Sequence, residues 1–298
     1  MKTAVEIMRF RAVINVLARN LFDTDRTETT GDYLHFKLFE VLVVGQTLWM
    51  CWNWAPYIDR LSTVVLPLGI AHYLDITFMF QSPAAWINAA LITLFCIWGW
   101  AGRLPFNRFA YLSALLLFHL QYVARYSQGS IAHGHNYTGM ALLALGISAV
   151  VFHTNARHRR KAAFGITLFF VGLGYSSAAV TKLAASGFGW VDGPHLWMWI
   201  GERATDMLSQ HGHAQMNVLQ EWILQNKSAA TAILTFGLIT ESLGFALWFR
   251  RSRPWIATMI LAMHLGITLT MDITFIYFIF IIGVIGYPWG RWLERFFD

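Results

Sequence analysis

The sequence predicts an all-α fold, a polytopic membrane bundle of about eight transmembrane helices. Hydrophobic residues make up 56% of the 298 residues and charged residues only 13%, whereas soluble domains carry about 25% charged residues. Apolar stretches near the length of about 20 residues that a helix needs to cross a bilayer recur along the chain. The net charge of +6 does not call for a nucleic-acid partner, because the basic residues cluster between these stretches.

The N-terminal segment, residues 1–34, is predicted to be amphipathic. Its first 22 residues mix Lys2, Arg9, Arg11 and Arg19 with apolar residues. That pattern lacks the order of a cleavable signal peptide. It is typical of a helix that lies on the inner membrane surface.

Eight apolar stretches are the candidate transmembrane helices. They are residues 38–54, 84–101, 109–123, 137–153, 163–182, 229–249, 254–271 and 273–288. A ninth stretch, residues 61–80, contains Pro67, His72 and Asp75. We expect it to be re-entrant or interfacial, because polar backbone at membrane depth must be buried in protein.

The loops between the stretches predict the orientation in the membrane. Basic residues concentrate in residues 103–108, 157–161, 250–253 and 291–295. Loops rich in Lys and Arg face the cytoplasm, so both termini are expected there, in what we take to be a bacterial inner membrane. Residues 35–290 then form one transmembrane domain with a short cytoplasmic tail, 291–298. Residues 183–228 lie outside the cytoplasm as one or two interfacial helices.

Ionisable residues mark the outer side of the predicted bundle. Lys182 closes a stretch that runs outward, His135 precedes one that runs inward, and Asp272 lies in an outer turn. Counting about 1.5 Å per helical residue places these three at one level. The same count places His119 and His264 near the midplane.

Helical spacing groups further polar residues with these. Thr268 lies midway between His264 and Asp272 on one stripe, and Tyr122 and Tyr126 follow His119 on another. Tyr175 precedes Lys182 by seven residues and shares its face, since residues seven apart lie two turns along a helix. Glu241 lies deeper than the midplane by the same count.

Each of these residues also has a structural explanation. The Lys182 ammonium could extend to the lipid headgroups, and His119 could bond a neighbouring helix. Glu241 could be the structural partner of a histidine or an arginine. Asp272 could cap the last helix, where a carboxylate is favourable. Arg125 and Tyr126 are expected to anchor the chain at the membrane interface.

No metal site or disulfide is expected. The pairs His133/His135 and His211/His213 have no cysteine or carboxylate at a familiar ligand spacing, and a closed site needs four ligands. The two cysteines, Cys51 and Cys96, both lie inside apolar stretches.

Three stretches carry a resemblance to a known family. They are HGHNYTGMALLAL at 133–145, VTKLAASGFGWVDG at 180–193 and MHLGITLTMDITFIYF at 263–278. In order and spacing they resemble the vitamin K-dependent γ-glutamyl carboxylase superfamily, in its horizontally transferred transmembrane (HTTM) domain. The resemblance covers roughly residues 35–290.

The resemblance implies a function and a set of site residues. Lys182 would be the general base that activates reduced vitamin K or another quinol, and His135 a second catalytic group. We expect His264, Trp190, Tyr175 and His119 to bind this cofactor. The implied activity is that of a carboxylase-like lyase or a quinol-oxygenating enzyme, with the bilayer, a lipophilic small molecule and a peptide substrate as partners.

Two other functions remain open at this point. The chain could be a non-catalytic module that binds a quinone, a lipid or a peptide, as a maturation or immunity factor. It could also be a transporter that moves protons or cations along the stripe of His264, Thr268 and Asp272.

Overall fold

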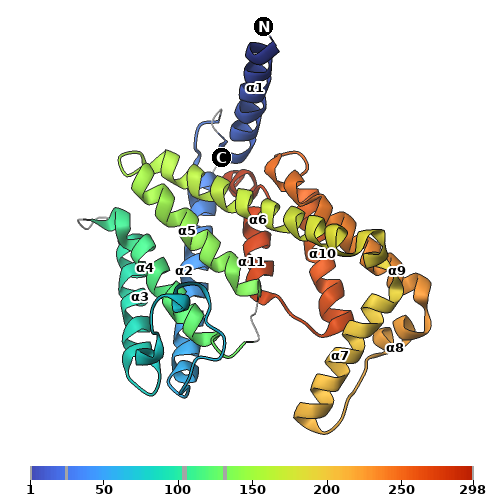
Figure 1. Cartoon of the computed structure of the whole chain (residues 1–298). Helices are drawn as coiled ribbons and strands as arrows, with labels where there is room; N and C mark the ends of the chain where they lie inside the picture. Colours follow the sequence, from blue (N-terminus) through green and yellow to red (C-terminus); the bar gives the residue numbers. More distant parts are fainter. Residues whose placement is uncertain (1, 24–25, 103–105, 130–132, 297–298) are drawn as a thin grey trace. The chain divides into compact units, whose positions relative to one another are not determined.

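The computed structural model describes residues 2–23, 26–102, 106–129 and 133–296, without the side chains of residues 2–10, 13 and 133. Regular structure in this part of the chain is helical throughout, with no strand (Figure 1). The predicted all-α fold is therefore confirmed. The basic loop predicted at 103–108 falls partly outside the described residues, at 103–105.

Within the described residues, four helices are long and apolar enough to cross a membrane. They are α2 (Thr30–Ile58), α3 (Ala84–Ala101), α6 (Ala156–Ser186) and α10 (Arg253–Met271). The long apolar helices fit a membrane protein, whereas the predicted number of about eight spans is not confirmed.

The other four predicted spans also contain helices, but short ones. They are α4 (Ala110–Arg125), α5 (Asn136–Val151), α9 (Lys227–Ser242) and α11 (Ile276–Ile285). The first three have 16 residues each and α11 has 10. At 1.5 Å per residue, 16 residues reach about 24 Å, less than the hydrocarbon thickness of about 30 Å.

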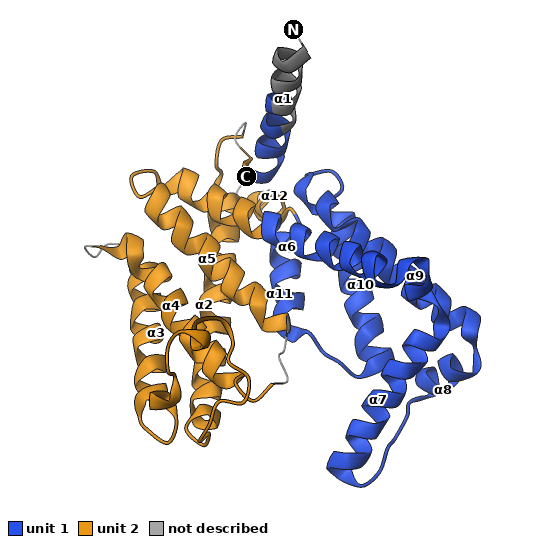
Figure 2. Ribbon diagram, in the orientation of Figure 1, with its two compact units in different colours: residues 1–21, 168–287 blue, residues 22–167, 288–298 orange. Residues whose placement is uncertain are grey.

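The chain divides into two compact units, coloured separately in Figure 2. Unit 1 comprises Met1–Leu21 and Leu168–Tyr287, and unit 2 comprises Phe22–Thr167 and Pro288–Asp298. The boundary falls within α6, so this helix contributes its first residues to unit 2 and the remainder to unit 1.

Buried polar side chains join the helices of unit 2. The Asn88 amide of α3 donates hydrogen bonds to the Leu117 carbonyl and to Gln121 Oε1, both on α4 and both at 3.0 Å. The Gln121 amide donates to the carbonyl of Cys51 on α2 at 2.6 Å. Interhelical hydrogen bonds of this kind hold membrane helices together where apolar burial gives no net driving force.

The two sequence segments of unit 2 contact each other at the start of α2. Thr29 and Asp32 form a capping box there, which satisfies two free backbone N–H groups. Helix α12 (Trp289–Glu294) packs on this turn, and Glu294 accepts a hydrogen bond from the Gly31 N–H at 2.7 Å. Hydrogen bonds from the Thr29 side chain and the Gly31 N–H lower the pKa of Glu294, because they stabilise its charged form.

Residues 61–80 form no α-helix, so this stretch differs from the eight predicted spans. Two short 3-10 turns, η1 (Gly69–His72) and η2 (Thr77–Met79), are the only regular structure described there. Asp75 accepts hydrogen bonds from the N–H and the hydroxyl of Thr77 at 2.9 and 2.7 Å. These bonds lower the pKa of Asp75. They also give the Asp75 carboxylate a structural role, because it binds the first residue of the η2 turn.

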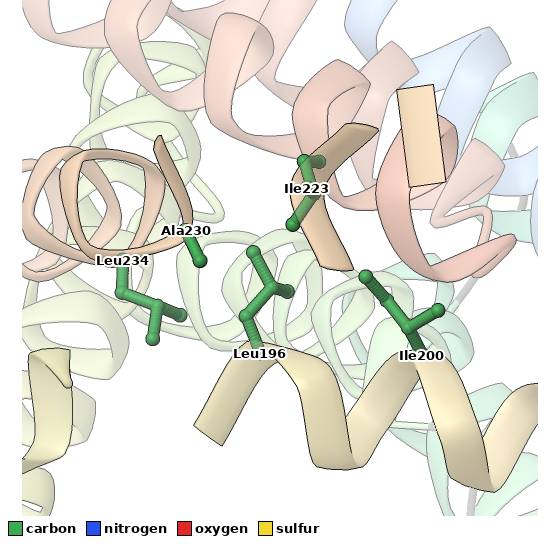
Figure 3. Close-up of a cluster of buried hydrophobic side chains, with 5 residues drawn as sticks. All are labelled: Leu196, Ile200, Ile223, Ala230 and Leu234. Carbon is green, nitrogen blue, oxygen red and sulfur yellow. The ribbon is translucent and has the colours of Figure 1, made fainter. Parts of the chain in front are cut away.

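Unit 1 has a hydrophobic core that joins α9 to two helices of the predicted loop 183–228 (Figure 3). The loop folds into α7 (Gly193–His211) and α8 (Val218–Gln225). The core side chains are Leu196, Ile200, Ile223, Ala230 and Leu234. Asn217 and Asn226 accept backbone N–H bonds at the starts of α8 and α9. The N-terminal helix α1 (Lys2–Phe22) is held at its end by Arg253, which donates to the Asn20 carbonyl at 3.0 Å.

Candidate functional site

Lys182 lies near the end of α6 and forms an ion pair with Glu241 of α9. Its Nζ donates to both carboxylate oxygens of Glu241 at 2.5 Å. The Lys182 side chain is 28% exposed and that of Glu241 is 12% exposed. The ammonium is therefore directed at a neighbouring helix and does not extend freely to lipid headgroups.

Trp190 contacts the same ammonium. After α6 the chain turns at Gly187, whose φ of +57° is a conformation that favours glycine. The 3-10 turn η5 (Gly187–Val191) that follows places the Trp190 ring centre 4.3 Å from Lys182 Nζ. A cation over an indole face is stabilised by the ring quadrupole. Lys182 thus has a carboxylate and an aromatic ring as its two partners.

Tyr175 and His264 form a second buried contact in unit 1. The Tyr175 hydroxyl lies 2.5 Å from His264 Nε2 of α10. The rings of Phe275 and Phe278 have their centres 4.9 Å from that of His264. The other nitrogen of His264, Nδ1, is buried without a hydrogen-bond partner in the described part of the chain.

A glycine after α9 allows the chain to pass close to Tyr175 of the second contact. Tyr175 precedes Lys182 by two turns of α6, as the spacing predicted. Gly244 of the 3-10 turn η6 (Gly244–Trp248) follows α9, and a Cβ added there would lie 2.5 Å from Tyr175 Cβ. The close approach of η6 to α6 therefore requires a residue without a side chain.

The polar groups of the predicted transport stripe are engaged within unit 1. The Thr268 hydroxyl donates to the carbonyls of His264 and Ile273 at 3.0 and 3.1 Å. Asp272 ends α10 with φ +53° and pairs with Arg203 of α7 at 2.9 Å. The proposal that Asp272 caps the last helix is wrong, because α11 begins after Phe275 without a side-chain cap.

His135, the other predicted catalytic residue, belongs to unit 2. Its Nδ1 lies 2.7 Å from the hydroxyl of Tyr126, and the ring of Trp54 stands perpendicular to it at 5.5 Å. Tyr126 is only 3% exposed, so the expectation that it anchors the chain at the interface is wrong. Arg125 instead stacks over Tyr57 of α2, 3.7 Å from the ring centre.

His119 also belongs to unit 2 and is exposed on α4. A Cβ at Gly69 of η1 would lie 3.0 Å from its Nε2. Of the predicted stripe, Tyr122 and Tyr126 contact each other, with ring centres 4.8 Å apart. The predicted site residues therefore fall into two sets, with Lys182, Trp190, Tyr175 and His264 in unit 1 and His135 and His119 in unit 2.

Glu241 is the residue of this candidate site that the sequence placed wrongly. Counting residues put it deeper than Lys182, whereas the two side chains are in contact. Helix α6 has 31 residues, about 46 Å at 1.5 Å per residue, which is longer than a hydrocarbon core of about 30 Å. A count from the end of an apolar stretch therefore does not fix the depth of a residue within this helix. The signal that could have paired them was their opposite charge within apolar stretches.

The histidine pairs do not form a metal centre in the described part of the chain. No group of three or more His, Cys, Asp or Glu residues is close enough to hold an ion there. The rings of His211 and His213 lie 6.4 Å apart and are exposed. The side chain of His133 lies outside the described residues.

A scan against models of protein families found no match for this chain, and searches of curated proteins and of solved structures found none either.

Proposed function

We propose that this chain is a multi-pass membrane protein of the carboxylase-like HTTM type that uses Lys182 for acid–base chemistry on a quinol or another lipophilic substrate. The observation that carries the proposal is the pair of hydrogen bonds, each of 2.5 Å, that Lys182 Nζ donates to the two carboxylate oxygens of Glu241. Ionisable residues within apolar helices are rare and costly, and they mark functional sites by default. The resemblance of residues 180–193 to the family's lysine segment supports the same residue.

The residues fit a quinol on chemical grounds. Trp190 offers an aromatic face beside Lys182, and Lys182 and Glu241 offer a base and an acid to a hydroxyl group. When bound, the quinol would supply an acidic hydroxyl and two electrons.

A proton can move between Lys182 Nζ and a carboxylate oxygen of Glu241. Lys182 Nζ can accept a proton only after it has passed its own to a Glu241 oxygen, which both hydrogen bonds allow. Removal of water on binding of a lipophilic substrate would favour this transfer, because a low dielectric disfavours both charged forms. Lys182 then acts as the general base, and Glu241 holds the displaced proton.

The test measures quinol turnover by the purified protein reconstituted in lipid. Lys182→Ala should lower the rate by at least about a hundredfold, the low end of the range for a general acid–base group. Glu241→Gln should also lower it, because the amide cannot take up the lysine proton. Lys227→Ala is the matched control, since Lys227 pairs with Asp192 in the same unit but both side chains are largely exposed. Full activity of Lys182→Ala would refute the proposal.

The same ion pair favours a second candidate function, that of a non-catalytic membrane module. An opposite charge within hydrogen-bond distance stabilises a protonated lysine, and a lysine held in that form would bind a lipophilic ligand without acting as a base. In this case wild-type protein would bind a quinone yet show no turnover. Lys182→Arg, which keeps the charge, would bind as well as wild type.

A further inference from the structure

A pocket in unit 2 brings an arginine together with buried polar groups at the ends of several helices. Its lining includes Glu40, Gly99, Asn107, Tyr111 and Arg159. The space of about 300 Å³ around these residues includes open solvent at the mouth of the pocket, and the room inside is about that of one water molecule. A ligand can therefore meet the pocket only at its mouth, with a small charged group, while its body stays outside.

Arg159 differs from the basic residues around it. The side chains of Arg157 and Lys161 donate to backbone carbonyls of the segment before α2, and Arg160 pairs with Glu28 at 2.5 Å. The guanidinium of Arg159 has no hydrogen bond or ion pair within the described residues, although it is half-buried and lines the pocket. Its positive charge is thus available to a ligand.

The carboxylate in the same pocket is already neutralised. Glu40 is only 5% exposed. It accepts a hydrogen bond from Lys37 Nζ at 2.5 Å and another from the Tyr111 hydroxyl at 2.9 Å. Lys37 lies outside the lining and balances the charge of Glu40. Among the described lining residues this leaves the positive charge of Arg159 unbalanced, which suits an anion.

Exposed aromatic side chains indicate the level at which the pocket opens. Trp100, Phe106 and Phe109 follow or flank the lining residues Gly99 and Asn107, and they are 50%, 71% and 43% exposed. Aromatic residues concentrate at the membrane interface, at the level of the headgroups. Basic pockets between transmembrane helices on the cytoplasmic side bind phosphate-bearing lipid headgroups.

We propose that the Arg159 pocket binds the phosphate of an anionic phospholipid from the cytoplasmic leaflet. The planar guanidinium supplies paired donors to the phosphate oxygens. The Asn107 side chain lies in the same lining and offers a further amide. The inference does not depend on the Lys182 site, which belongs to the other unit.

The test titrates the full-length protein in detergent with phosphatidylglycerol and follows bound lipid by native mass spectrometry. Arg159→Gln should weaken binding about tenfold or more, the scale of a lost hydrogen bond between charged groups. Arg251→Gln is the matched control, because Arg251 is an exposed arginine of another predicted cytoplasmic loop. It should bind as wild type does.

Two results would overturn the proposal. Equal affinity of wild type and Arg159→Gln would show that Arg159 is not the ligand. Displacement of the lipid by millimolar inorganic phosphate would show a site for soluble phosphate instead. Should Arg159→Gln fail to fold, Arg159→Lys keeps the charge but loses the paired donors, and unchanged binding by that variant would refute the guanidinium contact.

Discussion

At the scale of single residues, the Lys182–Glu241 pair decides both the proposed chemistry and part of the stability of unit 1. Removing one partner of a buried pair leaves an uncompensated charge, whereas removing both does not. Lys182→Met should therefore lower the free energy of unfolding by about 3 kcal/mol, the low end of the range for buried pairs, since the lysine is partly exposed. The measurement is unfolding in mixed detergent micelles.

The double variant Lys182→Met/Glu241→Leu is the informative comparison. It should recover much of the stability that the single variant loses, because no unpaired charge is left behind. Lys227→Met provides the control in the exposed pair with Asp192, where a change below about 1 kcal/mol is expected. Equal losses at Lys182 and Lys227 would contradict the account of a desolvated pair.

The sequence identified Lys182 and the face it shares with Tyr175, because ionisable and polar residues are conspicuous in apolar helices. It could not identify the partners. Glu241 lies 59 positions away from Lys182 and His264 lies 89 positions away from Tyr175, and no local spacing relates them. The prediction of an interfacial anchor at Tyr126 is wrong because this residue is buried with its hydroxyl 2.7 Å from His135, a contact that composition does not reveal.

At the scale of elements, glycines set how closely η6 approaches α6. A Cβ at position 244 would lie 2.5 Å from Tyr175 Cβ and 3.1 Å from the Gly172 carbonyl. Gly244→Ala should therefore destabilise unit 1 by about 1–3 kcal/mol, the usual cost of overpacking. It should also displace Tyr175 from His264. Thermal unfolding of the purified variant measures the first effect.

Gly237→Ala is the matched control for that substitution. Gly237 lies within α9, and a Cβ added there would meet no atom within 4 Å. Alanine is the better helix former by about 1 kcal/mol, so this variant should be as stable as wild type or slightly more stable. A Gly244→Ala protein that unfolds at the wild-type temperature would show that η6 can move away from α6 without cost.

The apolar stretches predicted where helices occur better than how long they are. The stretch 84–101 matches α3 at both ends, because no polar or glycine-rich segment interrupts it. The stretch 229–249 overestimates α9, which ends at Ser242 before the 3-10 turn at Gly244. Hydropathy stays high across that turn, so only packing against α6 reveals the break.

At the scale of the whole molecule, the sequence predicted one transmembrane domain over residues 35–290, while the structure groups the chain into two compact units with a boundary within α6. Helical periodicity shows that a helix has a face to bury, but it does not show which helix will cover that face. The final segment illustrates this point, because α12 packs on α2 across more than 250 residues of sequence.

The predicted orientation gives a test that involves the whole chain. Asn155 and Ser209 are both exposed and lie on either side of α6 in the sequence, and α6 is long enough to cross a bilayer. Cys51 and Cys96 are fully buried, so they should contribute little background to thiol labelling. In sealed right-side-out vesicles, a membrane-impermeant maleimide should label Ser209→Cys at once and Asn155→Cys only after permeabilisation, because the basic loop 157–161 is predicted to face the cytoplasm.

Each alternative labelling pattern would have a distinct meaning. Labelling of both cysteines before permeabilisation would show that α6 does not cross the membrane, and it would contradict the predicted outer position of Lys182. Labelling of Asn155→Cys alone would keep the crossing but reverse the orientation. In that case the Arg159 pocket would face the outer leaflet, where the positive-inside rule gives no reason for a cluster of basic residues. The expected pattern instead keeps Arg159 at the cytoplasmic leaflet, from which the proposed phospholipid is drawn.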